Sequence, residues 1–142
     1  MGLLEKIFKK KAPIRNKDTG TPLERYWKSF NHAIDGIIYC LKYEHNMIII
    51  LFATIAVIIC GFEFNISTPE WLFIVFICGA IAACEVINSS IEAIVDLITS
   101  DYHELAKIAK DTASSASLIL STTALIGGLI IFLPRILLLI GG

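Results

Sequence analysis

The chain has 142 residues, of which 56% are hydrophobic and 18% are charged, and its formal net charge at pH 7 is -1. In soluble proteins about a quarter of the residues are charged. A soluble chain with this sequence would be too short to bury all its long apolar runs and would leave several exposed to water. The composition therefore excludes an ordinary soluble domain and predicts an integral membrane protein.

Residues 1–22 form a basic leader. Prolines and a glycine interrupt it, which predicts a short helix followed by a loose linker. Its lysines favour contact with anionic lipid headgroups, and we expect no nucleic-acid partner.

Residues 23–142 form a single membrane domain. Apolar and polar side chains recur at helical spacing over residues 23–43, which predicts an amphipathic helix on the membrane surface. A plain cytoplasmic helix packed on the bundle is the alternative.

Three stretches are long and apolar enough to cross about 30 Å of hydrocarbon as helices. They cover residues 47–64, 71–100 and 113–133. The turn over residues 65–69 is predicted to end with Ser67 or Thr68 as the cap of the second span. In the connection between the second and third spans, Asp101 and Glu104 have capping-box spacing, which predicts a short separate helix.

Basic residues are distributed unevenly along the chain. Nine of the twelve lysines and arginines precede Glu44, and the segment from Met47 to Cys84 has none. Because basic residues accumulate on the cytoplasmic side of membrane proteins, we expect a multi-pass membrane protein with its N-terminus inside. Arg135 is then a single exception near the outer end.

The four cysteines show no metal-binding spacing, so we interpret them as small apolar residues.

Four polar residues of the second span share one helical face. They are Glu85, Asn88, Glu92 and Asp96. Because a helix turns by about 100° per residue, their side chains lie within one arc of about 80°. Ionisable groups inside a membrane cost about 3 kcal/mol each on insertion scales, so they are rare and serve mainly function or pairing. This stripe predicts a functional site.

The residue types in and around the stripe indicate its chemistry. Carboxylates at this spacing repel one another unless a cation intervenes, and oxygen ligands suit Mg²⁺, which commonly bridges carboxylates and phosphates. Glu44 lies at the same depth and is expected to join Glu92. Glu85 lies deeper, where desolvation makes a carboxylate a better general base. Neither a P-loop nor a kinase-type Gly-rich loop is present.

The segment Glu85–Asp96, with the sequence EVINSSIEAIVD, is followed by YHEL at Tyr102–Leu105 and AKIAKD at Ala106–Asp111. This pattern resembles the signature of the prokaryotic diacylglycerol kinase family, which includes undecaprenol kinases, from about Arg25 to Leu133. The resemblance implies a homotrimer of three-span chains that transfers the γ-phosphoryl group of ATP, with Mg²⁺, to a membrane lipid hydroxyl in active sites shared between subunits. Undecaprenol is slightly favoured over diacylglycerol as the acceptor.

The resemblance also implies roles for individual residues. Glu85 is the expected catalytic base, Glu44 and Glu92 are the expected metal ligands, and Asn88 and Asp96 support them. Nucleotide contacts are implied for Arg25, His32, Glu44, Glu92, Asp101, Tyr102, His103, Lys110 and Asp111. Lipid contacts are implied for Arg25, Glu85 and Ser114.

Two other hypotheses remain open from the sequence. An acidic stripe inside a membrane also suits a non-catalytic ion or proton pathway. A structural subunit that has kept only the fold is the second alternative, but the stripe and the Lys110–Asp111 pair argue against such decay.

Overall fold

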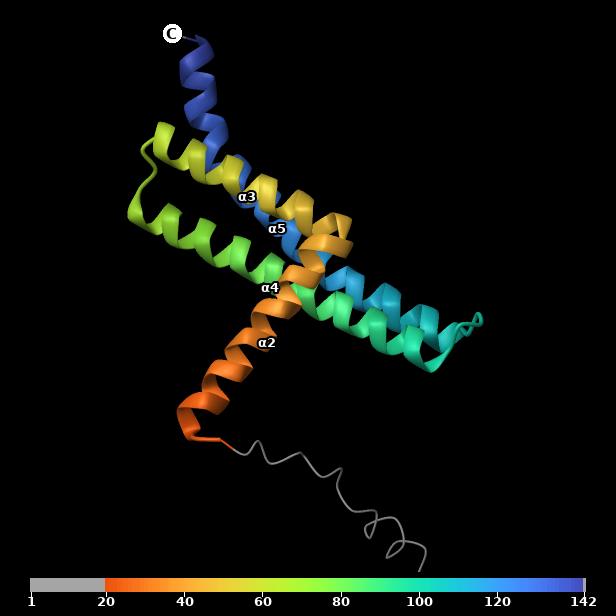
Figure 1. Cartoon of the computed structure of the whole chain (residues 1–142). Helices are drawn as coiled ribbons and strands as arrows, with labels where there is room; N and C mark the ends of the chain where they lie inside the picture. The colour runs from red at the N-terminus through yellow and green to blue at the C-terminus, as the bar shows by residue number, and fades with distance from the viewer. Residues whose placement is uncertain (1–19, 142) are drawn as a thin grey trace, which may run out of the picture. The chain divides into compact units, whose positions relative to one another are not determined.

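The computed structural model describes residues 20–141, so most of the predicted leader lies outside the described residues. Within this range the chain forms four helices and no strand, which confirms the predicted all-α class. They are α2 (Pro22–Tyr43), α3 (His45–Glu63), α4 (Thr68–Ile98) and α5 (Glu104–Gly141) (Figure 1). The helices α3, α4 and α5 are long and apolar enough to cross a membrane, as expected for three spans.

The helix α2 matches the predicted helix over residues 23–43. Its first turn is closed by a capping box, in which the Glu24 carboxylate accepts a hydrogen bond from Thr21 N at 2.9 Å and Thr21 Oγ1 accepts one from Glu24 N at 3.3 Å. The chain divides between Asp35 and Gly36 into two compact units. All the packing considered below lies within the second unit.

A tight turn joins α3 to α4, and we refer to this side of the second unit as the turn end. Asn65 adopts a left-handed conformation with φ of 46°, which asparagine tolerates better than most residues. Ser67 caps α4, as predicted, and its N–H and hydroxyl both donate to the Glu70 carboxylate at 2.7 Å. The sequence LFATIAVIICGFEFNIS thus ends one apolar helix and begins the next within four residues.

The apolar core of the second unit lies at the turn end. It is formed by Ile66, Ile74 and Ile131, with Val57, Phe64, Trp71, Phe73, Cys78 and Phe132 packed around them. Gly61 allows α3 to approach the Trp71 ring closely, because a Cβ at this position would lie 2.7 Å from that ring. In the most apolar 18-residue stretch of each helix, 33% of the residues are buried in α4, compared with 11% in α3 and 6% in α5. The helix that carries the polar stripe is therefore the central one.

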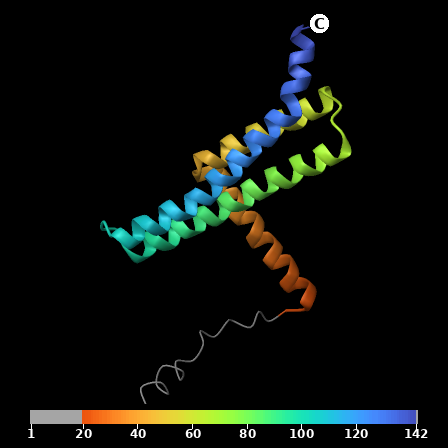
Figure 2. The same cartoon turned by 180° about the vertical axis from the view of Figure 1, so that it is seen from behind.

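The helices α4 and α5 run antiparallel and lie side by side, and the end of α5 extends past the α3–α4 turn (Figures 1 and 2). The short separate helix predicted at Asp101 and Glu104 is wrong, because α5 is continuous from Glu104 to Gly141. No glycine or proline interrupts the chain between Glu104 and Gly127, so nothing stops the helix. His103, not Asp101, caps its start, since Leu105 N donates to His103 Nδ1 at 3.2 Å and Lys107 N donates to His103 O at 3.0 Å.

An ion pair joins α4 and α5 at the turn end. Arg135 donates from Nη1 to Glu70 Oε1 at 3.0 Å and from Nη2 to Glu70 Oε2 at 2.9 Å. This two-bond geometry is the one that arginine and a carboxylate prefer. The pair explains how the chain accommodates Arg135, the exception in its charge pattern.

Candidate functional site

The polar stripe of α4 runs from the buried middle of the helix to its exposed end. Glu85 is 2% exposed and Asn88 is 6% exposed, whereas Glu92 is half-buried and the Asp96 side chain is 65% exposed. Glu85 is therefore the most buried member of the stripe. Desolvation therefore acts most strongly on this carboxylate and least on Asp96.

Asn88 holds the Glu92 carboxylate in place. Its Nδ2 donates to Glu92 Oε1 at 3.0 Å, one turn along the same helix. Its Oδ1 is buried and has no hydrogen-bond partner among the described residues. This amide orients one carboxylate oxygen of Glu92 and leaves an acceptor atom of its own for a further donor.

The connection between α4 and α5 forms a polar cleft, which we call the loop cleft, with a volume of about 290 Å³. It brings together five of the residues predicted to bind a nucleotide, together with Asp96 of the stripe. The five are Asp101, Tyr102, His103, Lys110 and Asp111, and the remaining wall is formed by Val95, Thr99, Ser100, Ala106 and Lys107.

Lys110 forms the shorter of the two ion pairs at the loop cleft. Its Nζ lies 2.5 Å from Asp96 Oδ1, and only 36% of its side chain is exposed. The hydrogen bond to Asp96 raises the pKa of the Lys110 ammonium above its ordinary 10.5, since burial, which lowers it, is the smaller effect. The lysine precedes the predicted third span, and it stays positively charged at neutral pH.

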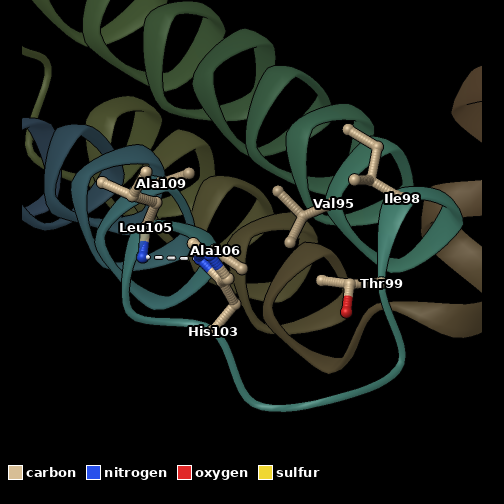
Figure 3. A pocket seen from close by; sticks show the side chains of 7 residues that line it. All are labelled: Val95, Ile98, Thr99, His103, Leu105, Ala106 and Ala109. Atoms are coloured by element: carbon tan, nitrogen blue, oxygen red, sulfur yellow. Dashed lines mark hydrogen bonds between the residues drawn. The ribbon is translucent and has the colours of Figure 1, made fainter.

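An apolar depression of about 320 Å³ borders the loop cleft (Figure 3). Val95, Ile98 and Thr99 of α4 form one side, and Leu105, Ala106 and Ala109 of α5 form the other. The His103 ring lies at its edge and also lines the loop cleft. This arrangement gives the α4–α5 connection one polar face and one apolar face, with the imidazole between them.

A second polar cavity, the Glu85 pocket, has a volume of about 300 Å³. It joins the predicted base Glu85 to the predicted lipid contact Ser114. The other residues around it are Asn46, Ile49, Ile50, Ser117, Leu118 and Ser121. A buried carboxylate at the wall of a half-apolar cavity suits a ligand that carries one polar group on an apolar body.

The remaining predicted residues lie elsewhere in the fold. Arg25 and His32 are exposed on α2 in the first unit, and His32 Nδ1 lies 3.9 Å from the Asp35 carboxylate. Glu44 is half-buried at the N-cap of α3. Within residues 20–141 no three side chains of His, Cys, Asp or Glu come together as a metal-binding cluster.

Sequence reasoning missed several residues of the site. Asn46, Ser117 and Ser121 line the Glu85 pocket, and Thr99 and Lys107 line the loop cleft. The signal for the serines was available, because the spacing of 114, 117 and 121 places them on one helix face. The spacing alone does not indicate a ligand, because small residues on one face also allow close packing between membrane helices.

The chain is similar to known proteins of one family. The family model of prokaryotic diacylglycerol kinase matches residues 31–132. An undecaprenol kinase of Bacillus subtilis strain 168 is 41% identical over 121 residues, covering 85% of this chain and 98% of the relative. A diacylglycerol kinase of Synechocystis is 33% identical over 128 residues, covering 89% of this chain and 73% of the relative. A diacylglycerol kinase of Escherichia coli K12 is 55% identical over 42 residues, covering 30% and 34% of the two chains.

Proposed function

The chain belongs to the prokaryotic diacylglycerol kinase family, and from this premise we propose that it transfers the γ-phosphoryl group of ATP to the hydroxyl group of a membrane lipid. Undecaprenol and diacylglycerol are the acceptor candidates, since relatives that cover most of the chain are kinases of these two lipids. Undecaprenol is slightly favoured for two reasons. The segments VDL at Val95–Leu97 and AKIAKD at Ala106–Asp111 resemble those of undecaprenol kinases, and the match to this chain covers 98% of the undecaprenol kinase.

The observation that carries the proposal is the division of the stripe by depth. Glu85 lies buried beside a cavity lined by both serine and apolar side chains, whereas Asp96 lies exposed in a polar cleft with Lys110. A lipid hydroxyl approaches from the apolar side, and a nucleotide approaches from the polar side. Phosphoryl transfer requires mainly positioning and charge neutralisation, and these two cavities supply both.

In the proposed reaction, Glu85 accepts the proton of the lipid hydroxyl. The hydroxyl oxygen forms a bond to the γ-phosphorus as the bond from that phosphorus to the bridging oxygen breaks, and the bridging oxygen leaves with ADP. Lys110, held by Asp96, binds phosphate oxygens, and Asp101, Tyr102, His103 and Asp111 contact the rest of the nucleotide. Arg25 and His32 are assigned to the same nucleotide, with Arg25 also near the lipid, and Ser114 is assigned to the lipid.

We assign Mg²⁺ to Glu44 and Glu92. The donor set fits the ion, since Asn88 orients the half-buried Glu92 carboxylate, and magnesium is typically bound by one or two carboxylates and by substrate phosphates. When bound, the ion neutralises charge on the transferring phosphoryl group. Asn88 and Asp96 keep the flanking side chains in position.

We further propose a homotrimer in the bacterial cell membrane, with shared active sites, the N-terminus and the loop cleft facing the cytoplasm and the α3–α4 turn outside. The distribution of lysine and arginine supports the orientation, and the family resemblance implies the trimer and its shared active sites. The loop cleft also carries the residues assigned to ATP, which is a cytoplasmic substrate.

A lipid-panel assay tests the proposed function. Purified protein in mixed micelles receives γ-labelled ATP and one lipid at a time, with and without Mg²⁺. We expect label in the lipid monophosphate for at least one of the two acceptors, and its loss when magnesium is chelated. Folded protein that labels neither lipid would contradict the proposal.

A further inference from the structure

The wall of the Glu85 pocket opposite α4 is formed by serines of α5. Ser114, Ser117 and Ser121 all line the cavity, and the sequence assigned only the first of them to the lipid. Serine hydroxyls in a membrane-spanning helix are polar groups that need a partner. The question is which of the three still has hydrogen-bonding capacity for a ligand.

The register of the two helices places the serines level with the stripe. Asp96 contacts Lys110, and Glu85 lies eleven residues before Asp96, as Ser121 lies eleven residues after Lys110. Because the helices run antiparallel with equal rise, Glu85 is about level with Ser121. By the same count Asn88 is about level with Leu118, the residue after Ser117, and Glu92 is about level with Ser114.

Ser117 differs from Ser114 and Ser115 in its hydrogen bonding. It differs from Ser121 in burial, because Ser121 is exposed whereas the Ser117 hydroxyl oxygen is buried. Ser114 donates to Asp111 O at 3.1 Å, and Ser115 donates to Thr112 O at 2.7 Å. The Ser117 Oγ atom is buried and has no partner among the described residues. A buried hydroxyl without a partner destabilises a fold. Ser117 also lines the pocket, and rotation about its χ1 is the motion that would bring Oγ to a ligand there.

Glu85 supplies the second half of the site. Its side chain is 98% buried, since the residue is 2% exposed, and it faces the same cavity. A carboxylate can only accept a hydrogen bond, whereas a serine hydroxyl can donate one. A lipid hydroxyl placed between them would donate to Glu85 and accept from Ser117, which satisfies all three groups.

We propose that Ser117 binds the reacting hydroxyl of the lipid acceptor, with its Oγ–H donating to the hydroxyl oxygen while that hydroxyl donates to Glu85. The inference rests on the proposed function and adds to it a residue that orients the nucleophile. The recognised chemistry is the alcohol itself. The contribution is therefore the same for a glycerolipid and for an isoprenoid alcohol.

The test compares three variants of the full-length protein in mixed micelles, with diacylglycerol and undecaprenol as separate acceptors. Ser117→Ala removes the hydroxyl, Ser117→Thr retains one, and Ser115→Ala is the control, because Ser115 does not line the pocket. Lipid phosphorylation, the KM for ATP and the thermal unfolding temperature are measured for each variant.

We expect Ser117→Ala to lower kcat/KM for the lipid by about 3- to 10-fold, the factor that one neutral hydrogen bond provides. The loss should be equal for every acceptor that the wild type uses. The KM for ATP should not change, and the unfolding temperature should stay level or rise, because a buried unpartnered hydroxyl has been removed. Ser117→Thr should recover most of the activity, and Ser115→Ala should match the wild type.

Three results would overturn the inference while leaving the kinase in place. They are an unchanged kcat/KM in Ser117→Ala, a loss that accompanies a lower unfolding temperature, and a loss confined to one of two acceptors that the wild type uses. If the wild type itself labels no lipid, the proposed function fails and the inference fails with it. The wild-type measurement therefore separates the two failures.

Discussion

At the scale of single residues, the environment of each carboxylate in the stripe sets what it can do. Glu85 is buried at the wall of the Glu85 pocket, Glu92 is held by an amide, and Asp96 is paired with a lysine. Three chemically similar side chains thereby receive three different tasks. The sequence supplies the spacing, and the packing of α4 against its neighbours supplies the differences in burial.

Lys110 is expected to be the main nucleotide anchor on α5. Lys110→Met removes the charge that binds phosphate and leaves Asp96 without its partner, so the KM for ATP should rise at least about tenfold, as for the loss of a charge-assisted hydrogen bond. Lys107→Met is the matched comparison, because Lys107 is 62% exposed and lies 4.0 Å from its partner Asp111, and its effect should be much smaller. Equal effects of the two variants on the KM would contradict the assignment.

The raised pKa of Lys110 also predicts a pH dependence. A raised pKa means that the Asp96–Lys110 pair is fully formed below the ordinary lysine value of 10.5 and is lost only as pH rises through the higher folded value. The KM for ATP should therefore show no transition assignable to Lys110 between neutral pH and 9. A lysine-dependent rise in KM within that range, absent from Lys110→Met, would be inconsistent with this pair.

At the scale of helices, most of the fold follows from the sequence. The apolar runs predicted three long helices, and Ser67 was predicted as a cap because its side chain suits an N-terminus. The sequence predicted a short separate helix capped by Asp101, because Asp101 and Glu104 have capping-box spacing. His103 caps α5 instead, and the helix continues from Glu104 without a break. The ion pair between Glu70 and Arg135 joins residues 65 positions apart, and no local pattern reports such a contact.

The contact between Gly127 and Phe73 is expected to set how closely α4 and α5 approach at the turn end. A Cβ at Gly127 would overlap the Phe73 ring, whereas a Cβ at the adjacent Gly128 would meet nothing within 4 Å. Gly127→Ala should destabilise the protein by about 1–3 kcal/mol through overpacking. Gly128→Ala should be neutral or stabilise it by up to about 1 kcal/mol.

Thermal unfolding in detergent compares the two glycine variants. Combining Gly127→Ala with Phe73→Leu should relieve the overlap and recover part of the lost stability. If Gly127→Ala and Gly128→Ala unfold at the same temperature, the close approach is not a constraint on the fold.

The Glu70–Arg135 pair is expected to hold the two helices together beyond the core. Glu70→Gln and Arg135→Gln should each lower the unfolding temperature. The double variant should lose less than the two single losses together, since the second substitution removes no further ion pair. Strictly additive losses would show that the two side chains do not stabilise each other.

At the scale of the whole molecule, the described helices expose many large apolar side chains, and only α4 is substantially buried within the chain. A bilayer, and the other subunits of the proposed trimer, account for this surface. The sequence predicted this class of protein and the stripe. It could not indicate the two separate cavities, because they depend on which faces of α4 and α5 meet.

The central claim is that Glu85 takes a proton from a lipid hydroxyl, and Glu85→Gln tests it most directly. The substitution keeps the size of the side chain and removes its basicity, so kcat for lipid phosphorylation should fall by about 10²- to 10⁴-fold, while ATP binding and the unfolding temperature are retained. Glu63→Gln, an exposed carboxylate at the end of α3, is the control and should remain active. Full lipid phosphorylation by Glu85→Gln, or a change in ion flux through liposomes without any lost transfer, would contradict the account.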